Sequence, residues 1–551
     1  MSWRGNDRWL VTGGWWLAVV CLLTTAPASA QRGRGGAPAA EKPGPWFNTP
    51  VPPPVSDPRK PVMKYDDAFG PLPATFKHRQ GKADELLDAA ALKQDQKKIV
   101  GFSLESLNAG DKVWGRRAAT PAFQHTLEWV VGEFKNAGLK EARVESYAVN
   151  GTMWVPQSWR VQILGDPAFG PGTADVTLQS AFPQPGGATI PNGVLAAPVV
   201  YVGHGTEADL AGRDVRGKIA VVHIRPEPSL FGSAEQGVAA RLVENGGAVG
   251  VINAIEGPGN AQYFDARFAC GKAPCFIVGG QDAWFLQTVI GKAGSAGVLD
   301  RLKIAMSLTS TEQGSLSSAN GIAVIPGKSA KRIIINAHAD GYFQGGDDNA
   351  SGVAVLVAMA RYFAKQPQPA HTLMFVASGG HHGPGNGPTS LVAAHPELKD
   401  GTLFILNLEH VAYTDVVRGK VRANGNIGMS WETSVTESAK AVGVTNESPF
   451  LFDLWARASR CFGVATYESA GTSVSGDLGG YRTLNVPMTQ MIQSGTFYHS
   501  SGDVYEQVPA EGLERAARFH AYFVEQADQA PEALIAAGKG TLYRSTLASC
   551  P

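Results

Sequence analysis

The sequence predicts an α/β fold with a mixed, mostly parallel sheet flanked by helices, accompanied by a smaller β-rich domain. Two observations favour this fold. Toward the C-terminus, apolar strand-like runs such as "IIIN", "TLMFVA" and "LFILNL" alternate with helix-like stretches, which is typical of parallel strands covered on both faces. Between about residues 155 and 299, short β-like runs are separated by glycine-rich turns, and this change indicates a separate small domain.

Length and charge limit the classes of protein to consider. The chain has 551 residues, which is too long for one ordinary core and favours two or three domains. It carries 48 basic and 48 acidic side chains, so its formal net charge is zero. Because no long run of one sign is present to follow a phosphate backbone, we expect no nucleic-acid partner.

Residues 1–30 have the pattern of a secretory signal peptide. Arg4 and Arg8 precede the apolar stretch "WWLAVVCLL", and "APASA" supplies a cleavage site after Ala30. A transmembrane anchor is the alternative, but the apolar core has only about a dozen residues, whereas a spanning helix needs roughly 20. Lipoprotein processing at Cys21 is not favoured, because Val20 stands where a small residue is needed. We therefore expect an exported protein, periplasmic or extracellular, with no stable membrane anchor after signal removal.

The segments that follow differ in composition. Residues 31–80 are rich in Pro and Gly, which favours an extended tether or a segment laid over a domain surface. Within residues 81–154, "TPAFQHTLEWVVGEFKNAGL" predicts a helix that is capped by Thr120 and ends at Gly138. Residues 531–551 form a C-terminal tail. The apolar stripe of the predicted helix consists of Phe123, Leu127, Val130, Val131 and Phe134.

Signal removal would leave four cysteines, an even number in an oxidising compartment, so disulfides are expected. Cys270 and Cys275 in "CGKAPC" are the better candidate pair, because they are close in the sequence. Cys461 and Cys550 are paired only as the two that remain.

Histidines and carboxylates follow the strands predicted toward the C-terminus. In an open parallel sheet, functional groups gather beyond the carboxyl ends of the strands. Each such residue alone has an ordinary explanation; Asp348, for example, could cap a helix. Together they predict a site for zinc or a related transition metal, and a bridging carboxylate suits two metal ions and a hydrolase. The residues are His338, Asp340, Asp347, Asp348, His381, His382, Glu409, His410 and His499.

Six stretches in this region resemble, in order and spacing, the two-zinc aminopeptidases of the glutamate carboxypeptidase and transferrin receptor group. They are "HAD", "GGDDNASGVAVLVAMAR", "TLMFVAS", "FILNLEH", "SGDLGGY" and "YHSSGDVYEQV", between about residues 320 and 527. The resemblance implies a zinc exopeptidase fold at residues 311–530, with residues 81–154 as its N-terminal helical part. "GRDVRGKIAVV" and "NGGAVGVINA" are similar to the protease-associated domain that this group often inserts, which implies such a domain at residues 155–310.

The resemblance also implies roles for individual residues. His338 and Glu409 correspond to ligands of one zinc ion, Asp348 to the bridging carboxylate, and His499 to a ligand of the second zinc ion. Asp340 corresponds to the residue that orients His338, in keeping with the need of a metal-bound imidazole for an acceptor on its other nitrogen. One or two zinc ions are therefore the expected cofactor.

The chain departs from this group at "SGGHHGPGNG", where the group has two consecutive glutamates and this chain has His381 and His382. The first glutamate is the general base and the second is a zinc ligand. His382 can hold zinc, because a neutral imidazole is a zinc ligand. His381, with an ordinary pKa near 6.5, can act as a general base. A pair that simply faces solvent is the alternative.

Three functions follow from these features. The first is an exported, zinc-dependent exopeptidase, with aminopeptidase activity foremost, that hydrolyses peptide bonds with a zinc-bound hydroxide. The second is a catalytically inactive binding or scaffolding protein, because the glutamate pair is missing. The third, a serine hydrolase, is disfavoured because no G-x-S-x-G stretch is present. The expected partner is a peptide or a small peptide-like substrate; side-chain specificity and oligomeric state are left open.

Overall fold

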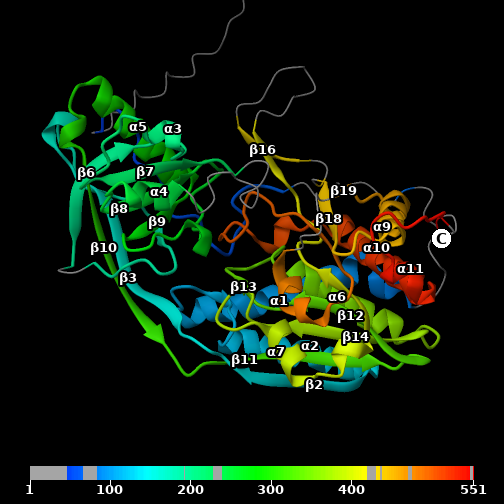
Figure 1. The fold of residues 1–551 in the computed structure, drawn as a ribbon. Coiled ribbons are helices and arrows are strands. Elements are labelled where there is room, and N and C mark those ends of the chain that lie inside the picture. The colour runs from blue at the N-terminus through cyan, green and yellow to red at the C-terminus, as the bar shows by residue number, and fades with distance from the viewer. Residues whose placement is uncertain are drawn as a thin grey trace, which may run out of the picture. The chain divides into compact units, whose positions relative to one another are not determined.

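Two eight-stranded sheets organise the described part of the chain, which we examine in a computed structural model (Figure 1). Contacts divide the chain into two units, Met1–Pro43 and Gly44–Pro551, and all that follows concerns the second unit. The predicted signal peptide lies outside the described residues, as does much of segment 31–80. The structure describes residues 46–65, 73, 83–190, 193–226, 239–418, 430–434, 437, 439–468, 475–545 and 550.

The main sheet is mixed, with a parallel centre. Its strand order is β19-β18-β20-β15-β12-β14-β11-β2. β12 is parallel to β14 and β15, and β15 is parallel to β20, whereas β11 is antiparallel to β14 and β2, and β18 to β20. This confirms the predicted α/β class. The strands are β2 (Lys140–Ala148), β11 (Ser317–Ile325), β12 (Ser329–His338), β14 (His371–Ser378), β15 (Thr402–Leu408), β18 (Lys440–Val444), β19 (Thr466–Glu468) and β20 (Met488–Ile492).

Helices cover both faces of the main sheet, because successive side chains of a strand face opposite sides. Ile333 and Ile335 of β12 pack into the core formed with α1, α2, α6, α9 and α10, whereas Ile334 packs with residues of α7 and α8. Burial on both sides explains why these strands are continuous apolar runs. The helices are α1 (Ala89–Ala109), α2 (Pro121–Ala137), α6 (Ala350–Phe363), α7 (Gly387–Ala394), α8 (Leu398–Gly401), α9 (Pro449–Phe462), α10 (Ala510–Gln529) and α11 (Glu532–Ala536). None of the helices within the described ranges is both long and apolar enough to span a bilayer.

The helix predicted after Thr120 is α2. The Thr120 hydroxyl accepts a hydrogen bond from the Phe123 amide, and Gly138 ends the helix with a φ of 89°, a left-handed conformation that favours glycine. Every residue of the predicted apolar stripe is buried. The sequence prediction is confirmed for this helix, and Phe134 from the stripe lies against Phe375 of the main sheet.

The second sheet is formed by the chain between β2 and β11. Its order is β4-β3-β10-β6-β7-β8-β9-β5, and β6, β7, β8 and β9 run parallel. β3 and β10 form its long antiparallel pair, which leads toward the main sheet (Figure 1). The strands are β3 (Met153–Ile163), β4 (Val176–Thr177), β5 (Phe182–Pro183), β6 (Leu195–Tyr201), β7 (Ile219–Ile224), β8 (Gly250–Ile255), β9 (Cys275–Val278) and β10 (Lys303–Gln313). Helices α3 (Glu207–Leu210), α4 (Ala239–Asn245) and α5 (Gly280–Ser295) accompany them.

Two short antiparallel pairs complete the strands that the described ranges contain. β1 (Gly115–Arg116) pairs with β13 (Gly341–Tyr342), and β16 (Val416–Arg418) pairs with β17 (Trp431–Thr433). The first pair lies next to the site described below, because β13 follows directly on the end of β12.

Both expected disulfides are formed. Cys270 is bonded to Cys275 at the start of β9, which confirms the preferred pair. Cys461 of α9 is bonded to Cys550, which confirms the pairing of the two remaining cysteines as well. The second bond fastens the C-terminal tail to a helix of the main core.

An ion-pair triad links three of the helices that cover the main sheet. Arg361 of α6 donates to Asp95 of α1 at 2.6 Å and to Glu133 of α2 at 2.7 Å. The Asp95 side chain is only 9% exposed. Burial raises the pKa of Asp95, and the Arg361 charge opposes that rise. Arg361 therefore offsets part of the cost of burying this carboxyl group between the helices.

Replacing Arg361 by Met is expected to lower the free energy of unfolding by about 1–3 kcal/mol, because it leaves a partly buried carboxylate without its partner. Urea unfolding followed by circular dichroism measures this loss. Arg216→Met is the matched control, since that side chain is 83% exposed and its ion-pair partner Asp214 is 63% exposed. Equal stability of the two variants would contradict a structural role for the triad.

Candidate metal centre

The residues predicted from the strand ends meet at one edge of the main sheet. His338 is the last residue of β12, His381 and His382 follow β14, and Glu409 follows β15. His499 lies in the loop after β20, and Asp348 precedes α6. Since the central strands are parallel, their carboxyl ends bring these side chains together.

Asp348 lies at the centre of the cluster. Its Oδ1 is 2.9 Å from His382 Nε2, 3.1 Å from His410 Nε2 and 3.3 Å from His338 Nε2. Its Oδ2 is 3.2 Å from His499 Nε2. Burial alone would raise the pKa of Asp348, but His382 and His410 outweigh burial and hold that pKa well below its usual range. Asp348 is therefore an ionised carboxylate that faces imidazoles through both of its oxygens.

His338 is fully buried and held from its Nδ1 side. The Nδ1 atom is 3.0 Å from the main-chain oxygen of Asp340 and 3.7 Å from its carboxylate Oδ1. The Asp340 carboxylate instead accepts the main-chain amide of His382. Asp340 thus faces the Nδ1 of His338, as predicted, but its closer oxygen is the main-chain carbonyl. Burial and the neighbouring His381 lower the pKa of His338, which leaves a neutral imidazole whose Nε2 faces Asp348.

The loop that carries Asp348 is fixed from two sides. Asp503 accepts the amides of Asp347 at 2.7 Å and of Asp348 at 3.0 Å. Below the loop, the buried Arg116 donates to the main-chain oxygens of Ala339, Gln344 and Gly345. These contacts position Asp348 without occupying its carboxylate oxygens.

Glu409 is buried and has one oxygen in use. Asn407 donates to its Oε2 at 2.7 Å, and Glu409 Oε1 lies 3.9 Å from His338 Nε2. Gly476, with a φ of 64°, backs this carboxylate so closely that an added Cβ would collide with it. A side chain at position 476 would push Glu409 away from the cluster.

His410 is a member of the cluster to which sequence reasoning gave no role. His410 was predicted only as one of the residues that follow the strand ends, although side chains of neighbouring strand residues face opposite ways. The chain leaves the strand there, however, and a φ of 51° at His410 turns its imidazole to the same side. Its Nδ1 lies 3.1 Å from Ser494 Oγ, and its Nε2 faces Asp348.

The donors form two groups that could each hold a metal ion. One contains His338, Glu409 and His410, and the other contains Asp348, His382 and His499; within each group the donor atoms lie within 4.8 Å of one another. Among the described residues, the Nε2 atoms of His338, His410 and His499 are buried without a hydrogen bond. Zinc is commonly bound by imidazole nitrogens together with carboxylates, so these buried nitrogens, which make no hydrogen bond, fit zinc.

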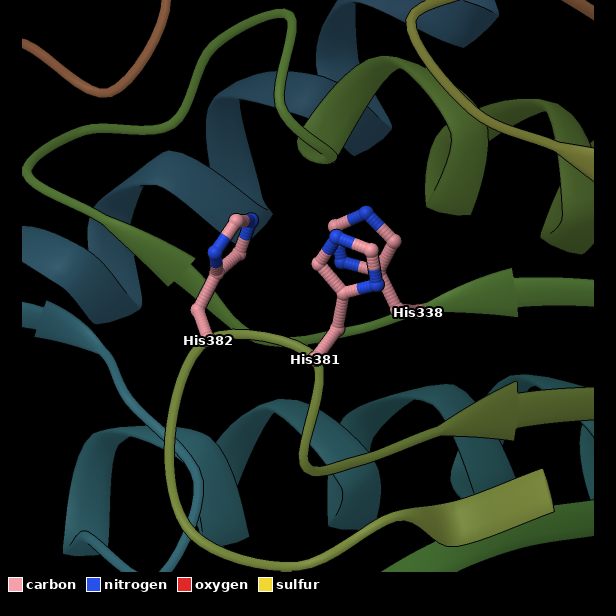
Figure 2. Close-up of side chains that lie close together, drawn as sticks. All are labelled: His338, His381 and His382. Carbon is pink, nitrogen blue, oxygen red and sulfur yellow. The ribbon is translucent and has the colours of Figure 1, made fainter. Parts of the chain in front are cut away.

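The rings of His381 and His382 extend to the same side of their loop, and the His381 ring lies beside that of His338 (Figure 2). His382 is 2% exposed and faces Asp348, and burial lowers its pKa to about 3, which leaves the neutral form that binds metal. His381 stacks on His338 with ring centroids 4.0 Å apart, and these two residues also form a third possible donor group with His382. The alternative of a pair that simply faces solvent is wrong, because the His381 side chain is only 16% exposed.

Asp477 contacts the Nδ1 side of His381. Its Oδ1 is 3.0 Å from His381 Nδ1, and its Oδ2 accepts hydrogen bonds from Ser378 and Asn336. The other nitrogen, His381 Nε2, lies 3.7 Å from Glu409 Oε1. Burial alone would lower the pKa of His381, but Glu409 and Asp477 raise it to about 10. Asp477 belongs to the stretch "SGDLGGY", which carried the resemblance but suggested no role for this residue.

Replacing His410 by Ala removes one donor from the first group. We expect the variant to bind zinc about 10–100-fold more weakly, the range known for loss of partners around a metal site. Competition with a chromophoric chelator measures the affinity. His395→Ala is the matched control, because His395 contacts Glu145 and Glu397 away from the cluster. Unchanged zinc binding by the His410 variant would contradict its place among the donors.

Comparison with known proteins agrees with this geometry. Residues 320–524 match the model of Peptidase family M28. No curated protein matches the chain. Among solved structures, an aminopeptidase from Aneurinibacillus sp. strain AM-1 is 21% identical, with 85% of this chain and 98% of that chain covered and a TM-score of 0.50.

Two further solved structures have the same fold. A peptidase M28 precursor from Shewanella amazonensis SB2B is 19% identical, with 80% of this chain and 96% of that chain covered and a TM-score of 0.55. BSAP, a zinc aminopeptidase from Bacillus subtilis, is 18% identical, with 82% of this chain and 98% of that chain covered and a TM-score of 0.54. Residues 320–524 are therefore a Peptidase family M28 domain, and the solved structures of similar fold include a zinc aminopeptidase.

Proposed function

We propose that the protein is an exported zinc-dependent aminopeptidase that removes residues from the amino terminus of peptides. The observation that carries this proposal is Asp348, which lies between two groups of metal donors and faces both. The aminopeptidases of similar fold support the choice of an exopeptidase.

Each donor has a role in this proposal. His338, Glu409 and His410 would hold one zinc ion, His382 and His499 would hold the other, and Asp348 would be shared between them. Bound zinc would polarise the peptide carbonyl and lower the pKa of the attacking water. The protein supplies the fixed, largely buried donors and the loop contacts from Arg116 and Asp503 that hold Asp348 in place.

His381 takes the place of the general-base glutamate. Asp477 occupies its Nδ1, so Nε2 is the atom that accepts a proton from the attacking water and returns it to the leaving amine. This is the arrangement by which a buried aspartate orients a catalytic histidine in other hydrolases. Neighbouring carboxylates raise the pKa of His381, and bound cations would offset the charges of Glu409 and Asp348.

The test is cleavage of a peptide library by the purified, zinc-loaded protein, with each peptide present in a free and an N-acetylated form. We expect release of amino-terminal residues from the free peptides only, loss of release after chelation, and recovery with zinc. Cleavage of acetylated peptides from the other end would contradict the aminopeptidase assignment, and cleavage of no peptide at all would contradict an enzyme.

A second candidate is an inactive peptidase-like binding or scaffolding protein, which the replacement of the glutamate pair by His381 and His382 favours. Zinc stoichiometry discriminates the two candidates when it is measured beside activity. Two tightly held zinc ions with turnover support the enzyme, whereas a protein that binds peptides without zinc or turnover supports the binding protein.

The proposal has two further parts. The region of the second sheet is proposed to be a protease-associated domain, and the protein is proposed to be exported. Export is supported by the pattern of residues 1–30 and by two disulfides, which are typical of oxidising compartments. Fusion of residues 1–30 to a reporter that is active only outside the cytoplasm tests export, and a reporter that stays inactive would contradict it.

A further inference from the structure

A segment that belongs to the second sheet's part of the chain lies along the loop that carries His499. Tyr263 and Ser500 form an antiparallel bridge. The Phe264 amide donates to the His499 main-chain oxygen at 3.0 Å, and the Ser501 amide donates to the Gln262 oxygen at 2.8 Å. The main chain on both sides of His499 is thus held by residues that precede β9, far from it in sequence.

The same segment places a buried carboxylate beside the His499 ring. Asp265 is 1% exposed, and its Oδ2 lies 3.2 Å from His499 Nδ1. His499 Nδ1 makes no hydrogen bond, so the carboxylate oxygen lies beside that nitrogen without being bonded to it. The opposite nitrogen, His499 Nε2, faces Asp348. The ring therefore has a carboxylate on each of its nitrogens.

Asp265 is itself fixed by neighbours from its own part of the chain. Arg267 Nε donates to both of its oxygens, at 2.8 and 3.0 Å, and the Asp265 amide donates to Gln184 Oε1 at 2.8 Å. Arg267 in turn lies over the ring of Tyr498, 4.7 Å from its centroid. The Asp265 carboxylate cannot swing away without breaking these contacts.

An aromatic cluster fastens this segment to the main-sheet part of the chain. Phe264 packs against Tyr342 of β13 with ring centroids 4.9 Å apart, and against Phe182 of β5 at 5.8 Å. Tyr342 also lies 5.3 Å from the His499 ring. The position of Asp265 relative to His499 is therefore set by rigid packing between residues of the two sheets.

We propose that Asp265 is a positioning residue for His499, so that the part of the chain forming the second sheet completes the metal centre of the main sheet. A metal-bound imidazole usually gives its other nitrogen to a carboxylate, which fixes the ring and increases its basicity as a ligand. Asp265 is placed to do this for His499, although it comes from the region of the second sheet. The proposal rests on the metal-binding role given to His499 in the proposed function.

The experiment compares zinc binding by the full-length wild type and by Asp265→Asn, using chelator competition and zinc stoichiometry as readouts. We expect one zinc ion to bind about 10–100-fold more weakly and the other to keep its affinity. His499→Ala should weaken the same zinc ion, and adding Asp265→Asn to it should cause little further loss, because the two residues act as one unit. Asp265→Glu, which restores the carboxylate, should recover part of the affinity.

Two variants guard against a merely structural effect. Arg267→Gln loosens the surroundings of Asp265 but keeps the carboxylate, so it should weaken zinc binding less than Asp265→Asn. Asp209→Asn, in the exposed cap of α3, should leave zinc binding unchanged. Wild-type affinity for both zinc ions in Asp265→Asn, or an equal loss in Arg267→Gln, would overturn the role of Asp265. A wild type that binds no zinc would overturn the proposed function together with it.

Discussion

Asp348→Asn is expected to lose both zinc ions and nearly all peptidase activity. The Asp348 carboxylate faces donors of both metal groups, and an amide is a much weaker zinc ligand. Because metal ions supply several kcal/mol of transition-state stabilisation, kcat/KM should fall by on the order of 10³-fold. Zinc content by mass spectrometry and turnover of an amino-terminal substrate measure the two losses together.

The neighbouring residue provides the control for this change. Burial raises the pKa of Asp347 above its usual range, and Asn keeps the size and polarity of its side chain. Asp347 also belongs to neither donor group. Asp347→Asn should therefore keep both zinc ions. Zinc retention by Asp348→Asn at the wild-type level would contradict the bridging role.

His381→Ala is expected to lower kcat by about 10²–10⁴-fold while zinc content stays at the wild-type level, because loss of a general base has effects of this size. Stopped-flow or steady-state assays on zinc-loaded protein measure kcat separately from KM. His382→Ala should instead lower zinc content, since its Nε2 faces Asp348. The two histidines are thus distinguished by different measurements: loss of His381 lowers kcat, and loss of His382 lowers zinc content.

Further variants test the base assignment. Asp477→Asn should lower kcat in the same direction as His381→Ala, because it removes the acceptor at His381 Nδ1. His381→Glu restores the residue that the group has at this position and should recover much of the lost turnover. Equal and negligible effects of His381→Ala and His382→Ala would contradict both assignments, and unchanged kcat in His381→Ala alone would remove it as the base.

The sequence was sufficient to predict the main sheet and most of the donors. Continuous apolar runs such as "LFILNL" mark strands buried on both faces, and residues directly after such strands must share one edge of a parallel sheet. His338, Glu409 and His382 were found in this way. The rule uses only the order of strands along the chain, which local patterns reveal well.

The rule placed His410 at the site without giving it a role, and it missed two other contributors, Asp477 and Asp265. His410 shares the site with Glu409 because of a local left-handed backbone conformation, which residue types alone do not announce. Asp477 lies in a 3-10 helix, Gly476–Leu484, rather than at a strand end. Asp265 comes from the region of the other sheet, and its contact with His499 depends on how the two sheets pack.

The place of the second sheet between β2 and β11 has a consequence for folding kinetics. Ser317 of β11 pairs with Ala148 of β2, although the whole second sheet separates them along the chain. The cost of closing such a loop grows with its length, and long-range pairings of this kind slow folding. β3 and β10 leave the second sheet as an antiparallel pair, however, and bring the ends of β2 and β11 together. If the second sheet forms first, β2 and β11 can pair at the edge of the main sheet as the two strands of a short hairpin do. Weakening the β3–β10 pairing should therefore slow the pairing of β2 with β11.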